Sequence, residues 1–210
     1  MAKHYAIGKL YAPDVDSYIV STAPTSNYGT SEQLIVGANS SKGGGDIFRA
    51  LLRQNIWQRW PQLPQDATID SAKIWFYVSS YSGLPSTINY TMRRVLRAWT
   101  ETGVTWNKYD GTNDWTTAGC GSDGNDYTST GAINFNGPSA TGWFSLTITS
   151  LVQDAHASRS GSFNVIVVHN DAGSGVTWTF QGCDSLTRPC RLEINWSLAN
   201  KAGAQVLVCG

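Results

Sequence analysis

Short runs in which apolar and polar residues alternate recur along the whole chain and constrain its fold more than any other feature. In residues 72–78, Ile74, Phe76 and Val78 fall on one face of an extended segment, and Trp75 and Tyr77 fall on the other. Successive side chains of a strand point to opposite sides, so such a run predicts a strand with one buried face. The same pattern is present in residues 48–57, 88–97, 143–149, 163–170, 176–181 and 191–198.

Turn-forming residues separate these runs, as in residues 23–30, 39–46 and 61–66. One segment is different: Ser150 followed by Gln153 fits a capping box, which predicts a short helix over residues 151–157. Many short strands without a repeating strand–helix–strand rhythm predict an all-β chain, a two-sheet antiparallel β-sandwich of jelly-roll type with one short helix. We expect an N-terminal arm (1–13), one sandwich domain (14–198) and a C-terminal tail (199–210).

Charge and composition exclude several classes of function. The chain has 15 Lys and Arg against 15 Asp and Glu, so no nucleic-acid partner is expected. No apolar run is long enough for a signal peptide or a membrane span, which predicts synthesis in the cytoplasm and no membrane partner. For the four cysteines (Cys120, Cys183, Cys190 and Cys209) free thiols are expected, although Cys183 and Cys190 are close enough in sequence for a local disulfide.

Residues suited to catalysis do not form a recognisable set. The three histidines (His4, His156 and His169) lie in no nucleophile motif. Glu101 shares a loop with Asp110 and Asp114, and a pair of acids is what a glycosidase needs. Glu101 lies in a turn-like segment, however, where we expect it to accept backbone N–H groups. The prediction is a protein without catalytic residues, not an enzyme.

Oxygen ligands for a metal ion are concentrated in residues 121–128. Asp123, Asn125 and Asp126 are closely spaced hard ligands and make a weak calcium site the only cofactor to consider. The segment lacks the EF-hand pattern, and a solvated turn is the favoured interpretation.

Aromatic residues supply the candidate contacts. Trp75 and Tyr77 form a two-ring face that would lie beside Arg93 or Arg97, and it is either open to a sugar or covered by a loop or subunit. Trp57 and Trp60 leave the same two alternatives. The apolar run Val206, Leu207 and Val208 either contacts a partner or forms an extra edge strand of the same domain.

Three tryptophans lie in the irregular segment 98–115. Trp99 and Trp106 are predicted to pin a long loop across the end of the sandwich, with Trp106→Ala costing about 3–5 kcal/mol. Trp115 stays open as a contact residue.

Several motifs occur in an order that resembles a known family. The most specific are NYGT (27–30), TETGVTWN (100–107) and LVQD (151–154). Residues 14–197 are similar to DNRLRE-type domains, also described as carbohydrate-binding module family 96 and related to disaggregatase domains. The resemblance implies a jelly-roll sandwich. Such modules occur in secreted and surface polysaccharide-active proteins, where some are credited with binding sugars, and similar domains occur in bacteriophage structural proteins. The family's RFDL strand reads RQNI here (53–56), without its Asp.

Two functions follow from this resemblance. Because neither a signal peptide nor a catalytic neighbour is seen, the preferred hypothesis is a virion structural protein of a phage. It would decorate or cement the capsid through protein–protein contacts, with the capsid shell or its own copies as partners in a homo-oligomer. The alternative is a secreted or cell-surface carbohydrate-binding module that recognises a polysaccharide through exposed aromatic rings.

Overall fold

The computed structural model describes residues 15–39, 45–57, 63–170 and 175–198, and in this part the chain is almost entirely β. Most strand bounds follow the alternating runs. The elements are β1 (Val15–Val20), β2 (Gln33–Ala38), β3 (Ile47–Asn55), β4 (Ala67–Ser82), the short 3-10 helix η1 (Pro85–Thr87), β5 (Asn89–Val95), β6 (Tyr127–Asn136), β7 (Gly142–Thr147), α1 (Thr149–Ser158), β8 (Ser162–His169), β9 (Thr177–Gln181) and β10 (Arg191–Leu198). No helix in these ranges is long and apolar enough to cross a membrane.

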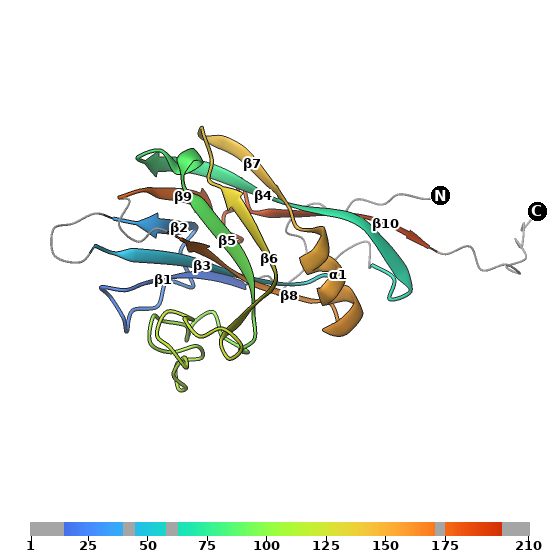
Figure 1. Cartoon of the computed structure of the whole chain (residues 1–210), viewed down its shortest axis with the longest axis horizontal. Helices are drawn as coiled ribbons and strands as arrows, with labels where there is room; N and C mark the ends of the chain where they lie inside the picture. Colours follow the sequence, from blue (N-terminus) through green and yellow to red (C-terminus); the bar gives the residue numbers. More distant parts are fainter. Residues whose placement is uncertain (1–14, 40–44, 58–62, 171–174, 199–210) are drawn as a thin grey trace, which may run out of the picture.

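The strands form one antiparallel sheet that curls on itself (Figure 1). Its order is β10-β4-β9-β2-β3-β8-β5-β6, with β1 also paired to β3 and β7 to β4. The long strand β4 makes the curl possible, because it pairs first with β10 over residues 67–75 and then with β9 over residues 78–82. The all-β, sandwich-like prediction is confirmed, and its layers belong to one continuous hydrogen-bonded sheet.

The main core lies inside this curl. Ile74, Phe76 and Val78 of β4 are fully buried in it, as their alternation predicts. Phe76 contacts Phe180 and Trp178 of β9, with ring centroids 4.5 and 5.8 Å apart. Burial of so many large apolar side chains is the dominant stabilising contribution to a fold of this kind.

A second core lies on the opposite face of β3 and β8. Leu51, Ile166 and Val168 point away from the main core and pack against Trp99 and Trp115 of the segment that joins β5 to β6. This segment (96–126, yellow-green in Figure 1), which we call the covering loop, therefore covers a sheet face rather than an end of the sandwich. It explains why seven consecutive residues of β8, from 163 to 169, are buried, since both faces of the strand are covered.

A helix forms where the sequence predicts it, but its first turn has no capping box. Helix α1 begins after Ile148, and no side chain caps its first turn. Thr149 instead accepts the N–H of Ala72 through Oγ1, and Gln153 donates its side-chain amide to the carbonyl of Ile69. The capping-box prediction was wrong because α1 lies against β4, whose backbone takes the polar side chains of the first turn.

Buried thiols give a first testable expectation. Burial raises the pKa of Cys120 far above its usual range, and a hydrogen bond with Cys190 together with burial raises that of Cys183. Because the thiolate is the reactive form, iodoacetamide at pH 8 should leave both thiols unlabelled in the folded chain and label them after denaturation in reductant. Peptide mass spectrometry measures this. Labelling of native Cys120 at the rate of a free cysteine would contradict its burial. Cys209 lies outside the described residues.

Candidate functional site: an aromatic platform on β4, β7 and β10

Three aromatic side chains gather on the outer face of the sheet where β4 lies between β7 and β10. Trp75 and Tyr77 come from β4 and are half-buried, and Trp143 comes from β7 and is 40% exposed. The register places Tyr77 opposite Trp143 and Trp75 opposite Arg191 of β10. Since these residues are out of phase with Ile74, Phe76 and Val78, they point away from the main core. We call this set the aromatic platform.

Arginine side chains complete the platform. Tyr77 and Trp143 meet edge to face, with centroids 5.4 Å apart at 79°. The guanidinium of Arg188, from the loop between β9 and β10, lies 4.1 Å from the centre of the Tyr77 ring. That of Arg191 lies 4.2 Å from the centre of the Trp143 ring. Such cation–π contacts hold both the aromatic rings and the guanidinium groups in place.

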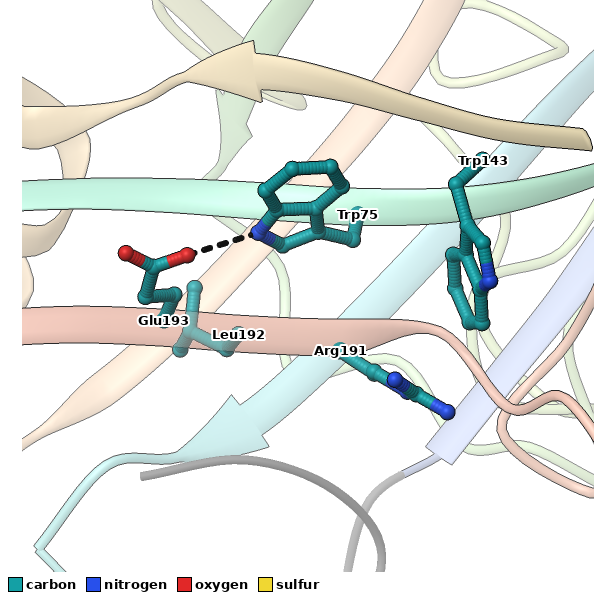
Figure 2. A pocket seen from close by; sticks show the side chains of 5 residues that line it. All are labelled: Trp75, Trp143, Arg191, Leu192 and Glu193. Atoms are coloured by element: carbon teal, nitrogen blue, oxygen red, sulfur yellow. Dashed lines mark hydrogen bonds between the residues drawn. The ribbon is translucent and has the colours of Figure 1, made fainter. Parts of the chain in front are cut away.

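A pocket opens between the two tryptophans. It measures about 290 Å³ and is lined by Trp75, Trp143, Arg191, Leu192 and Glu193 (Figure 2). The Trp75 indole N–H donates to a Glu193 carboxylate oxygen over 2.9 Å. The pocket therefore combines apolar ring surface with a guanidinium and a carboxylate, a mixture of mostly apolar lining and few polar groups that is typical of small-molecule sites.

The sequence identified part of this site. Trp75 and Tyr77 share a face as predicted, but Arg93 and Arg97 do not lie beside them. Arg93 instead stacks on Tyr127, 4.6 Å from the ring centre. Trp143 was missed, although its phase opposite to Phe144 and Leu146 was a usable signal, because those two residues pack against the main core. Arg188 and Arg191 reach the platform only through strand pairing, which short-range patterns do not reveal.

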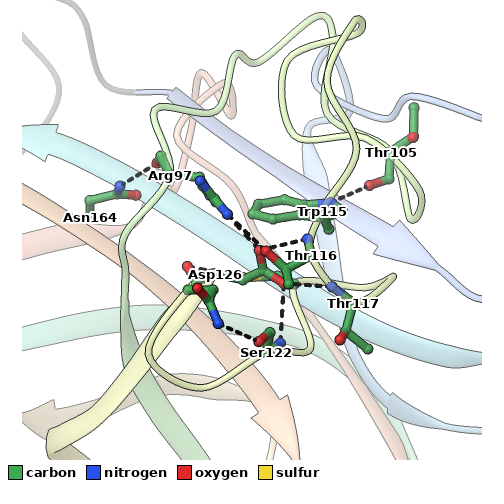
Figure 3. A network of polar contacts seen from close by, with 10 residues as sticks. Arg97, Thr105, Trp115, Thr116, Thr117, Ser122, Asp126 and Asn164 are labelled. Atoms are coloured by element: carbon green, nitrogen blue, oxygen red, sulfur yellow. Dashed lines mark hydrogen bonds and ion pairs between the residues drawn. The ribbon is translucent and has the colours of Figure 1, made fainter.

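The predicted calcium ligands have other roles. Asp126 is fully buried, and its carboxylate accepts the backbone N–H groups of Thr116, Thr117 and Ser122 at 2.9–3.1 Å (Figure 3). Arg97 also lies 3.5 Å from it. The carboxylate of Asp126 therefore holds the loop together, and its oxygens already accept backbone N–H groups, which favours a structural role over the weak calcium alternative.

The two neighbouring ligand candidates bind local groups. The carboxylate of Asp123 accepts the backbone N–H and the hydroxyl of Ser129, and Asn125 donates its side-chain amide to Ser122. Both residues are exposed. These contacts match the solvated-turn interpretation of the segment.

The other described tryptophans that the sequence singled out lie in a core or pack against one. Trp115 is only 4% exposed and donates its indole N–H to the carbonyl of Thr105, so it is a core residue and not a surface contact (Figure 3). Trp99 is fully buried, whereas Trp106 is half-buried beneath the guanidinium of Arg49. Trp57 packs against the main core, and its indole N–H donates to Nδ1 of His156 over 2.9 Å. These contacts give Trp57 a structural role.

Some of the predicted residues lie outside the described part of the chain. These are Trp60 and the apolar run Val206, Leu207 and Val208. Glu101 is described, and it accepts a backbone N–H as predicted. The donor is Asp16 of β1, at 3.1 Å, rather than a residue of its own turn.

Comparison with known families gives a match for this chain. None of the curated proteins compared with the chain matches it. The profile of carbohydrate-binding module family 96 matches residues 9–195, which is most of the chain. The described strands, the covering loop and the aromatic platform all fall inside this range. The chain therefore belongs to carbohydrate-binding module family 96.

Proposed function

We propose that this chain binds a polysaccharide through the aromatic platform. The observation that carries the proposal is the pocket between Trp75 and Trp143, with Arg191 and Glu193 at its side. Ring surfaces can cover the C–H groups of a sugar, while the guanidinium and the carboxylate can bind its hydroxyls. Family membership supports this function over the virion function, for which the comparisons offer no support.

The proposed site would bind without catalysis. Trp143 is the most exposed ring of the platform, and it is held between Tyr77 and Arg191. Rigid aromatic side chains in a pocket supply much of the binding energy of an interface at low entropic cost. Trp143 is therefore the residue whose removal should weaken binding most.

Trp143→Ala tests the platform directly. Affinity electrophoresis against a panel of neutral and uronate polysaccharides identifies a ligand, and titration calorimetry then measures Kd. We expect Trp143→Ala to raise Kd at least about tenfold, because the main stacking surface is lost. Tyr81→Ala is the matched control, since Tyr81 is on the same strand, is 41% exposed and does not line the pocket. Unchanged binding by Trp143→Ala, or an equal loss in Tyr81→Ala, would contradict the proposal.

A further inference from the structure

Three carboxylates from distant parts of the chain converge at a place that does not belong to the lining of the platform pocket. Asp16 belongs to β1, Glu101 to the segment that joins β5 to β6, and Asp184 to the loop between β9 and β10. One carboxylate oxygen from each of the three lies within 4.8 Å of the other two. The whole chain has no net charge, so this concentration of acids is local and does not follow from an acidic composition.

Asp16 is the member that needs a further partner. Its side chain is fully buried, and its Oδ2 accepts the backbone N–H of Cys183. Its Oδ1 is buried and has no hydrogen-bond partner within the described ranges. A buried carboxylate oxygen without a partner costs free energy, and burial together with Asp184 and Glu101 raises the pKa of Asp16 to about 6.

Two glycines let the backbone approach the cluster closely. A Cβ at Gly182 would lie 2.9 Å from Oδ2 and 3.1 Å from Oδ1 of Asp16. A Cβ at Gly29 would lie 2.1 Å from the carbonyl oxygen of Glu101. Both glycines therefore permit close approach, and Gly182 keeps the space beside both Asp16 oxygens free of a side chain.

We propose that Asp16, Glu101 and Asp184 together bind one calcium ion. Calcium takes six to eight oxygen ligands at about 2.3–2.6 Å, in flexible geometry, so two oxygens on one ion lie at most about 5 Å apart. The three carboxylates meet this condition. Asp16 Oδ1 gains the partner that it lacks, and the ion offsets two of the three negative charges of the cluster. Arg53 acts electrostatically on Glu101, but its guanidinium is engaged with the carbonyl of Trp99.

Zinc is the competing ion, because Asp16 also lies near Cys183 and Cys190. Two thiolates on one tetrahedral zinc lie about 3.8 Å apart, since each Zn–S bond is about 2.3 Å. The two sulfur atoms here are 2.7 Å apart, in a thiol–thiol contact. The sulfur atoms are therefore arranged for each other, and the all-oxygen set with its hard ligands favours calcium.

The calcium site can be tested on the full chain after treatment with EGTA and dialysis. Calcium chloride is titrated in, and the melting temperature and the binding heat are measured. We expect a saturable rise of about 5–10 °C at a calcium concentration about 100 times Kd. Equal concentrations of magnesium should give a smaller rise, because magnesium demands a stricter octahedral geometry.

Variants locate the bound ion. Asp16→Asn and Asp184→Asn should each lose most of the calcium-dependent rise, and Asp184→Asn serves if the buried Asp16 variant does not fold. Asp123→Asn is the matched control, because it removes an acid from the loop segment 121–128 and should keep the full rise. The proposal fails if the wild type shows no saturable rise, if the first two variants keep it, or if Asp123→Asn loses it.

Discussion

Trp99→Ala is expected to lower the free energy of unfolding by about 3–5 kcal/mol, because it removes the largest fully buried side chain of the second core. The ring is fully buried, and its indole N–H donates to Asn164 Oδ1 over 2.7 Å. Asn164 in turn donates to the carbonyls of Val95 and Arg97, so the loss also leaves part of this buried network without a partner. Chemical denaturation followed by circular dichroism measures the effect.

Trp106→Ala is the matched control for this variant. Sequence reasoning assigns Trp106 the same cost of about 3–5 kcal/mol, but the structure leaves its ring half-buried on Arg49. A partly exposed side chain loses less buried area when it is truncated, so a smaller destabilisation is expected. Equal denaturation midpoints for the two variants would contradict the assignment of Trp99 as the main contact between loop and sheet.

Asp126→Asn is expected to cost about 3 kcal/mol, because it breaks the charged centre of the covering loop. Asparagine has the same shape but keeps only one acceptor oxygen, and its amide donor would face one of the N–H groups of Thr116, Thr117 or Ser122. Thermal unfolding at pH 7 measures the loss. Asp114→Asn is the control in the same loop: its side chain is 73% exposed and pairs with Lys108, so a change below about 1 kcal/mol is expected.

Acid titration gives a second readout for Asp126. Burial alone would raise its pKa, but the backbone N–H groups of Thr117, Thr116 and Ser122 together lower it below the ordinary value of 3.8. A lowered pKa in the folded state means that the ionised form stabilises the fold above pH 3.8 and that this contribution is lost as the pH falls further. The stability difference between the wild type and Asp126→Asn should therefore shrink below pH 3.8. A difference that stays constant would show that the charge is not responsible.

Local patterns in the sequence predict the strands but not how their faces are covered. The alternation around Phe76 correctly separates the main core from the platform face, because both faces are properties of one strand. The same rule does not describe β8, since its second face is buried by residues from a loop that lies far away in the chain. Trp115 was misjudged for the same reason: only the folded loop places its ring against the sheet.

Charged residues show most clearly what the spacing of residues in the sequence cannot predict. The acids that are neighbours in sequence, Asp123 and Asp126, bind groups of their own loop. The acids that converge, Asp16 and Glu101, are 85 residues apart, and their proximity depends on the covering loop meeting β1. A spacing pattern finds ligands only when one segment supplies them, so a site built from three segments has no such signature.

The position of β4 has a consequence for how this protein can change during evolution. Trp75 and Tyr77 alternate with Ile74, Phe76 and Val78, which are fully buried. The packing of the interior therefore fixes the spacing between the platform rings. A mutation that altered this spacing would also destabilise the fold and would be selected against. Arg188 is exposed on the loop between β9 and β10. New ligand preferences should therefore arise by substitution in that loop, while the spacing between the platform rings stays the same.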